Sequence, residues 1–242
     1  MCFSAEASFA AGTALVPAGV YCLAAAARKK PAHLPLAAVP LLFGVQQFAE
    51  GVVWHALEHG RPELVRPAAL VFLFFALAFW PFWFPFLTAV TDTRPAGRRA
   101  FATLAVLATA WFVVLYLPLL TGPESLLQVR VVHHSIRYDF PDLAVYQYVP
   151  RTPLRVLYLL CVALPMALGS EGWGRVPGLI LAASAAAAFL LFEYAFVSVW
   201  CFFAAVLAAY LVVLFRRLPE PATGRAVAPR GVAWGTSLPP QG

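Results

Sequence analysis

The sequence has few charged residues: Asp, Glu, Lys and Arg make up 12% of its 242 residues, whereas hydrophobic residues make up 62%. In ordinary soluble domains about a quarter of the residues are charged, so this composition excludes a typical water-soluble fold. The apolar residues gather in stretches of the length that crosses a bilayer, about 20 residues in a helix. The sequence therefore predicts an all-α, polytopic membrane protein.

The apolar stretches lack residues that several functions of membrane proteins require. No lysine lies in any of them, which excludes a retinal Schiff base, and no pair of histidines faces each other at mid-membrane depth, which argues against a b-type haem. Basic residues do not gather on one water-facing surface, so the formal charge of +6 does not indicate nucleic-acid binding. No basic residues precede the first stretch, so a cleavable signal peptide is not expected.

Seven apolar stretches are the expected spans. The last two form one run that is too long for a single crossing, so we expect a turn near residues 193–198. One long tilted helix, which would make six spans, is the alternative. The expected spans are Phe9–Ala27, Leu34–Leu57, Pro67–Val90, Phe101–Leu120, Pro153–Gly169, Pro177–Phe196 and Val197–Arg216.

Basic residues in the short connections set the expected orientation. They follow the first, third and last spans and also lie between the fifth and sixth, which is typical of cytoplasmic loops. This pattern places the N-terminus outside the cell (inner) membrane and the C-terminus in the cytoplasm. We expect a seven-helix domain over residues 1–217 with its outer loop, 121–152, as a lid, and a disordered cytoplasmic tail over 218–242.

The third span carries two prolines within the aromatic segment 80–85, WPFWFP. A proline inside a helix removes a backbone hydrogen bond and kinks the helix. We therefore expect a kink in this span, with the aromatic residues as packing and interface anchors.

The second span carries one polar stripe. Gln46, Gln47, Glu50 and Trp54 fall on one side of a helix of 3.6 residues per turn. Lipid cannot satisfy a carboxylate and two amides, so the stripe should face the interior of the bundle. The two glutamines are explained by hydrogen bonds between helices. The more costly carboxylate of Glu50 is the stronger functional candidate.

Other polar candidates map to the outer end of the bundle. The outer loop contains VRVVHHSIRYDF, an alternating, strand-like segment centred on His133 and His134. Adjacent residues of a strand face opposite sides, so one of these histidines would enter a site. Glu193 lies at the expected turn, near the depth of Glu50. Tyr138, Trp200 and Cys201 complete the expected ligand pocket. We expect no comparable polar set at the inner end.

The N-terminus, MCFSAEASF, carries a second type of candidate. If Met1 is removed, Cys2 presents an amine and a thiol on one residue. This pair can chelate a soft or borderline metal, or act as a nucleophile whose amine is the base.

Three segments, MCFSAEASF, QQFAEG and VSVWCFFAA, resemble an uncharacterised bacterial family of seven-span membrane proteins that open with Met-Cys-Phe-Ser-Ala. The resemblance implies no reaction. The residues that it implicates are Cys2, Phe3, Ser4, Gln46, Gln47, Glu50, Trp200 and Cys201.

Three hypotheses about function follow. The outer site binds zinc or copper through Cys2, His133 or His134, and Glu50 or Glu193. Alternatively, the protein is a membrane hydrolase that attacks a lipid or peptide bond with Cys2 or a metal-bound water. In the third hypothesis it is a receptor, transporter or accessory subunit that holds a small ligand or proton at Glu50. Residue types favour binding over catalysis, because no complete catalytic set with tight spacing is present.

Overall fold

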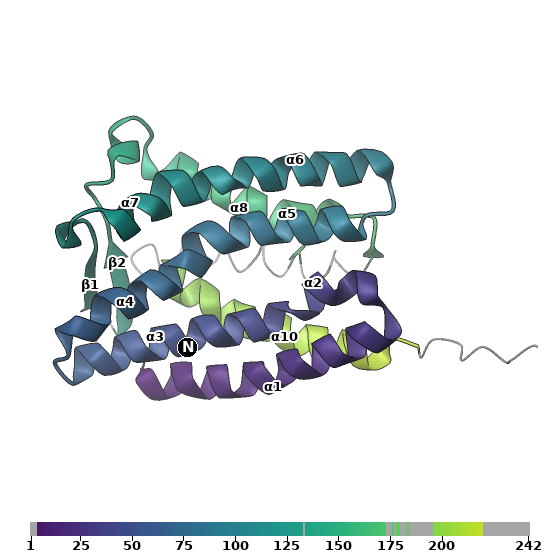
Figure 1. The fold of residues 1–242 in the computed structure, drawn as a ribbon, viewed down its shortest axis with the longest axis horizontal. Helices are drawn as coiled ribbons and strands as arrows, with labels where there is room; N and C mark the ends of the chain where they lie inside the picture. Colours follow the sequence, from purple (N-terminus) through teal and green to yellow (C-terminus); the bar gives the residue numbers. More distant parts are fainter. Residues whose placement is uncertain are drawn as a thin grey trace, which may run out of the picture.

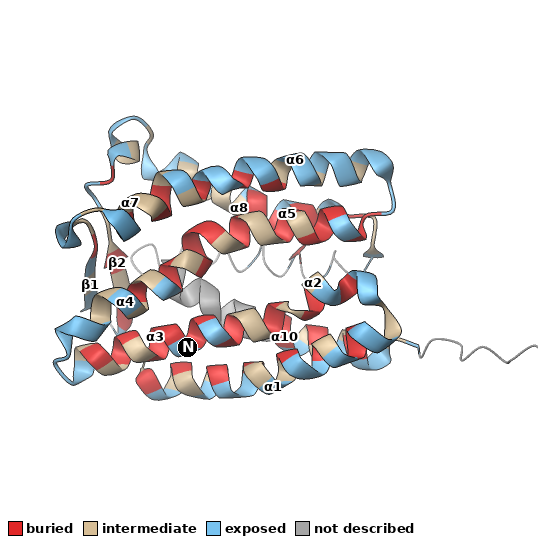
Figure 2. Cartoon of the chain, in the orientation of Figure 1, coloured by how far each residue is buried: buried red, intermediate tan, exposed pale blue. Residues whose placement is uncertain are grey.

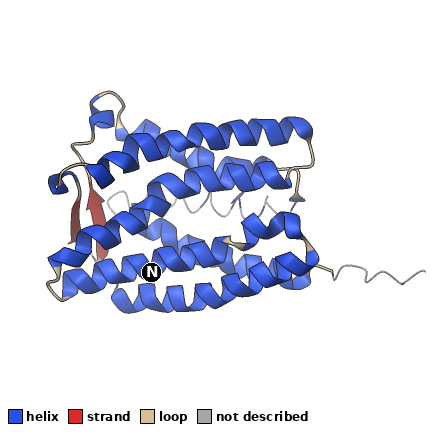
Figure 3. Cartoon of the chain, viewed as in Figure 1, coloured by secondary structure: helices blue, strands red, loops and turns tan. Residues whose placement is uncertain are grey.

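The computed structural model describes residues 4–132, 134–172, 176, 178–179, 183 and 196–219. Helices dominate this part of the chain, and its two strands lie together at one end (Figure 3). Five helices within it are long and apolar enough to cross a membrane, which fits a multi-pass membrane protein. These are Ala5–Lys29, Pro31–Glu58, Pro62–Thr91, Pro95–Thr121 and Arg151–Leu168.

The longer helices run along the long axis of the molecule (Figure 1). One end, which we call the hairpin end, carries the strands. The other, which we call the basic end, carries the α5–α6 turn and the last residues of α1 and α10. The elements are α1 (Ala5–Lys29), η1 (Pro31–His33), α2 (Leu34–Ala37), α3 (Val39–Glu58), α4 (Pro62–Leu73), η2 (Phe74–Phe79), α5 (Trp80–Thr91), α6 (Pro95–Trp111), η3 (Phe112–Tyr116), α7 (Leu117–Thr121), η4 (Glu124–Leu126), β1 (Gln128–Val132), β2 (Ser135–Asp139), η5 (Ala144–Gln147), α8 (Arg151–Leu168) and α10 (Phe196–Arg217).

Two π-helical segments interrupt the spans. In η2 the wide turn closes where the Trp80 amide donates to the Phe75 carbonyl, and in η3 the Leu117 amide donates to the Phe112 carbonyl. A proline follows each segment, Pro81 after η2 and Pro118 after η3. Proline lacks an amide donor and clashes with the carbonyl four residues earlier, and a wider turn relieves that clash. The expected kink in the third span thus takes the form of a π-helical turn, and α4 and α5 run in different directions (Figure 1).

The outer loop contains a β-hairpin. Strands β1 and β2 are antiparallel, and Val132 lies opposite Ser135. His134 has φ 57°, a left-handed conformation that is typical of two-residue hairpin turns. The prediction that His134 lies on a strand is therefore wrong, because the chain reverses at this position. His133 lies outside the described residues.

The hairpin packs back onto the bundle. Strand β1 contacts α4 and strand β2 contacts α10, while the Tyr138 ring stacks on Phe72 with 5.0 Å between centroids. Ile136 and Leu143 of the same loop are almost fully buried. An all-α bundle thus carries a two-stranded sheet on one end, and apolar side chains hold that sheet in place.

Helices α1 and α3 are antiparallel neighbours that approach closely through glycines. A Cβ on Gly44 of α3 would lie 2.8 Å from Val16 Cγ2 of α1, and one on Gly19 of α1 would collide with the backbone of Leu41. Small residues allow this approach, which in membranes supplies much of the packing between helices. Figure 2 shows buried residues recurring along α3 and α5, whereas α6 is largely exposed.

We expect Gly19→Ala to separate α1 from α3 and to destabilise the fold by about 1–3 kcal/mol, the usual effect of overpacking. Gly172→Ala is the matched control, because no atom lies within 4 Å of the added Cβ. Thermal unfolding in detergent, monitored by circular dichroism, measures the unfolding midpoints of both variants. Equal midpoints for the two variants would contradict close packing at Gly19.

Candidate functional site

The buried apolar residues form two clusters, one toward each end of the bundle. The basic-end cluster includes Leu15, Phe43 and Leu87, and the hairpin-end cluster includes Ala5 and Val53. On α3 the basic-end cluster stops at Phe43, and the hairpin-end cluster starts at Ala49. The polar stripe of α3 begins between these two positions, so a polar layer separates the two apolar clusters.

The polar layer is buried and internally hydrogen-bonded. The exposed fractions of Gln46, Gln47 and Glu50 are 1%, 3% and 0%. Trp80 Nε1 donates to Gln46 Oε1 at 2.7 Å, and Gln47 Nε2 donates to Glu50 Oε2 at 3.5 Å. Gln46 and Glu50 also make further interactions. The layer therefore connects α3 to α5 at the first residue after the π-helical segment η2.

Two further polar groups lie at this level. Gly12 of α1 faces Phe48 of α3, and Phe9 of α1 faces Gly51 of α3. The two helices are antiparallel, so this register places Ser8 of α1 opposite the turn of α3 that follows Glu50. Trp54 lies one helical turn beyond Glu50. Ser8 Oγ and Trp54 Nε1 are buried, and within the described part of the chain neither has a hydrogen-bond partner. Buried donors are normally satisfied, and the described residues supply no partner for either of these two groups.

The structure brings together some of the predicted site residues. Gln46, Gln47, Glu50 and Trp54 line one stretch of α3, as the helical spacing predicted. Tyr138 lies in the hairpin-end cluster with Trp54. Sequence analysis missed Trp80, the partner of Gln46, because the two residues lie 34 positions apart and no local pattern joins them.

The other predicted site residues are described in part or not at all. Cys2, His133 and Glu193 lie outside the described residues, and Trp200 and Cys201 are on α10, where their side chains are not described. Among the residues that are described, no group of three or more His, Cys, Asp or Glu side chains could hold a metal ion. Zinc or copper binding therefore stays a prediction from the sequence.

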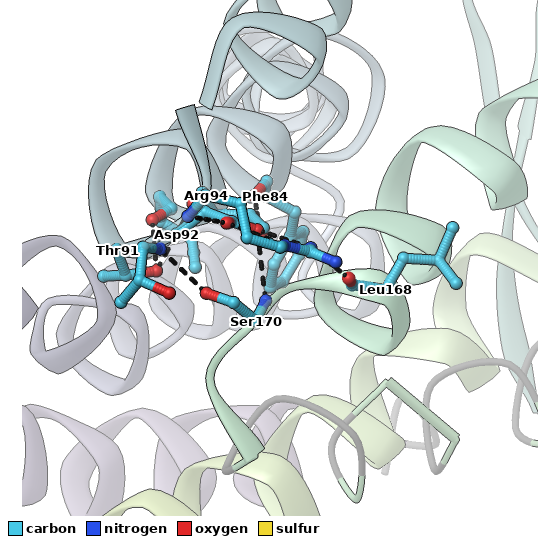
Figure 4. Close-up of polar contacts among 9 residues, drawn as sticks. Phe84, Thr91, Asp92, Arg94, Leu168 and Ser170 are labelled. Atoms are coloured by element: carbon cyan, nitrogen blue, oxygen red, sulfur yellow. Dashed lines mark hydrogen bonds and ion pairs between the residues drawn. The ribbon is translucent and has the colours of Figure 1, made fainter. Parts of the chain in front are cut away.

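The basic end carries a polar cluster that the sequence analysis did not expect. The buried Asp92 carboxylate accepts hydrogen bonds from Arg94 N, Nε and Nη2 at 2.8, 3.1 and 2.7 Å, and from Ser170 N at 3.1 Å (Figure 4). Thr93 N donates to Ser170 Oγ at 2.8 Å, and Arg94 Nη2 donates to the Leu168 carbonyl at 2.7 Å. The expectation of no polar set at this end is wrong.

The Asp92 cluster, formed by Asp92, Arg94 and Ser170, joins the α5–α6 turn to the end of α8. Its signal in the sequence is a single acidic residue followed by three arginines, in the segment TDTRPAGRR. Glu171, which follows Ser170, extends the network because its carboxylate forms an ion pair with Lys30 at 3.3 Å. The turns that follow α1, α5 and α8 are therefore linked at one end of the bundle.

Hydrogen bonds from Arg94 hold the pKa of the Asp92 carboxyl well below its usual range, against the opposing effect of burial. A carboxyl with a lowered pKa stabilises the folded state above its unfolded pKa of about 3.9, and this contribution is lost as the pH falls toward the folded value. The Asp92 cluster should therefore be fully formed at neutral pH.

The chain belongs to a family of unknown function, DUF6629, whose family model matches residues 1–226. No curated protein and no solved structure matches the chain. The resemblance to an uncharacterised family is thus confirmed, and family membership assigns no activity. Bacterial origin stays a prediction.

We expect Asp92→Asn to lower the unfolding midpoint by a few degrees at pH 7, since it removes charge-assisted hydrogen bonds. The difference from the unmodified protein should shrink below about pH 4, where Asp92 itself becomes protonated in the unfolded state. Asp142→Asn, at an exposed position, is the control. Thermal scans from pH 3 to pH 7 measure the difference, and a difference that does not change with pH would contradict this assignment.

Proposed function

We propose that this member of the family is a seven-span protein of the cell (inner) membrane and that its functional centre is the polar layer at Glu50. The layer binds a proton, together with a small polar occupant, in a transporter, receptor or accessory subunit. The observation that carries the proposal is a carboxyl group with 0% exposure, held by a glutamine amide inside an apolar bundle.

The burial of Glu50 supports proton binding. An ionised carboxylate is expensive at membrane depth, and a buried carboxyl either binds a proton or is stabilised by donors around it. Gln47 supplies one donor at 3.5 Å, a distance at the long end of the hydrogen-bond range. Glu50 also makes further interactions, and we propose that it exchanges between a protonated form and a hydrogen-bonded ionised form.

The same layer favours binding over hydrolysis. Nucleophilic catalysis needs a hydroxyl or thiol within hydrogen-bond reach of a base. In the part of the chain that the structure describes, the buried Ser8 hydroxyl has no hydrogen-bond partner. The hydrolase hypothesis relies on Cys2 or a metal-bound water, and Cys2 lies outside the described residues, whereas the proton site uses residues whose contacts are described.

The distribution of charge supports the proposed topology. Lys29 at the end of α1 donates to the Leu218 carbonyl after α10, so the basic ends of these two helices lie together. Arg94, Arg98 and Arg99 surround the α5–α6 turn at the same end (Figure 1). Basic clusters of this kind mark the cytoplasmic side. Together with the sixth span that the sequence predicts over Pro177–Phe196, which lies largely outside the described residues, this supports a topology with the N-terminus outside.

Glu50→Gln tests the proton site. We expect infrared difference spectra of the reconstituted protein, recorded between acidic and alkaline pH, to show a protonated carboxyl band that is lost in Glu50→Gln. Glu58→Gln is the matched control, because Glu58 is exposed at the end of the same helix. A spectrum that Glu50→Gln leaves unchanged would refute proton binding at this residue.

Zinc or copper binding at Cys2 is tested separately. Elemental analysis of the detergent-purified protein, prepared without chelators, should find near-stoichiometric metal that is lost in Cys2→Ala if the sequence prediction is right. A metal-free protein would exclude the metal site and leave the Glu50 proposal unaffected.

A further inference from the structure

Helices α5 and α6 form a hairpin that is bounded on both sides by π-helical turns. Segment η2 precedes α5 and segment η3 follows α6, and the two segments contact each other. The Phe74 ring of η2 meets the Tyr116 ring of η3 edge to face, with 5.6 Å between centroids. Both interruptions of regular α-helix therefore lie side by side, at one level of the bundle.

Paired interruptions of this kind create a hinge. A π-helical turn breaks the regular ladder of backbone hydrogen bonds, and it is a recognised place for a helix to bend. A single interrupted helix would be held straight by an intact neighbour. Here both helices of the hairpin are interrupted together, so residues 80–111 can tilt as one unit.

The far end of the hairpin is fastened by directional polar contacts. Along its length α5 packs on α8 through apolar side chains such as Leu87 and Met166. At its tip, Arg94 donates to the Leu168 carbonyl, and the Ser170 amide donates to Asp92. Two helices that touch only through apolar side chains can slide along each other, whereas these hydrogen bonds hold the tip of the hairpin at one position relative to the end of α8. The Asp92 cluster therefore has the geometry of a latch (Figure 4).

The hinge is joined to the polar layer. Trp80 is the first residue of α5 after η2, and its indole donates to Gln46 at 2.7 Å. A tilt of the hairpin about η2 must move Trp80 relative to α3. The hydrogen-bonding of Gln46, four residues from Glu50 on the same helix, therefore depends on the position of the hairpin.

We propose that the α5–α6 hairpin is a movable arm that pivots at η2 and η3 and is held closed at the basic end by the Asp92 cluster. Opening of the arm separates the ends of α5 and α8 and gives the polar layer access to the cytoplasmic side. The motion and the latch do not depend on whether Glu50 binds a proton.

Thiol labelling tests the arm. Thr88 is buried on α5, and a Cβ on Gly169 would lie 3.1 Å from its Cγ2, so a cysteine at Thr88 reports on separation of α5 from α8. The reporter Thr88→Cys is placed in the full chain with the four native cysteines replaced. Its reaction with a membrane-impermeant maleimide is then followed in inside-out and right-side-out vesicles.

Asp92→Asn should raise the labelling rate of this reporter by about tenfold or more, from the basic side only, because hydrogen bonds to a charged group are lost. Asp139→Asn is the matched control. Asp139 also pairs with two arginines, Arg130 and Arg137, but all three lie within the β-hairpin. Ser170→Ala removes one contact of the latch and should give a smaller increase.

A second reporter, Val53→Cys, separates opening of the arm from general loosening, because Val53 is fully buried toward the hairpin end. The proposal predicts no change there in Asp92→Asn. Unchanged labelling of the Thr88 reporter in both latch variants would overturn the proposal, and so would an equal rise at both reporters. Loss of the infrared band in Glu50→Gln together with unchanged Thr88 labelling would support the proton site and refute the arm.

Discussion

The burial of the Glu50 carboxyl between two apolar clusters is the constraint on which the rest of the structure depends. Polar groups at this depth need partners from the protein, since lipid offers none. Gln47 of the same helix, α3, donates to Glu50, and Trp80 of the neighbouring α5 donates to Gln46. The close packing of α1 on α3 through glycines encloses the layer on another side. The polar layer thus joins α3 to α5, and the glycine contacts hold α1 against α3 beside it.

The same layer lies where the helices are least regular. Segment η2 ends at Phe79, two residues before Pro81, and the indole of the intervening Trp80 donates into the layer. Proline explains the wide turn, and Trp80, the first residue after that turn, donates to Gln46. The proposed binding site and the proposed hinge therefore lie next to the same proline, and the Asp92 cluster lies at the opposite end of the same hairpin.

Helical periodicity predicted the polar stripe of α3 because its residues are local in sequence. The partner of Gln46 and the Asp92 cluster were not predictable in this way, since Ser170 and Asp92 are 78 positions apart. The turn at His134 was missed for a different reason. The two residues between Val132 and Ser135 are both histidines, so no Gly, Asn, Asp or Pro marked a turn there. Long-range pairing and unusual turn chemistry account for these differences.

The most direct measurement is modification of Glu50 by a lipid-soluble carbodiimide, located by mass spectrometry over a range of pH. Such reagents react with protonated carboxyl groups in apolar surroundings. We expect Glu50 to be modified at low pH and protected at high pH, with the exposed Glu58 much less reactive from the lipid phase. A Glu50 that is unreactive at every pH, or that reacts equally at every pH, would contradict a proton-exchanging site in the polar layer.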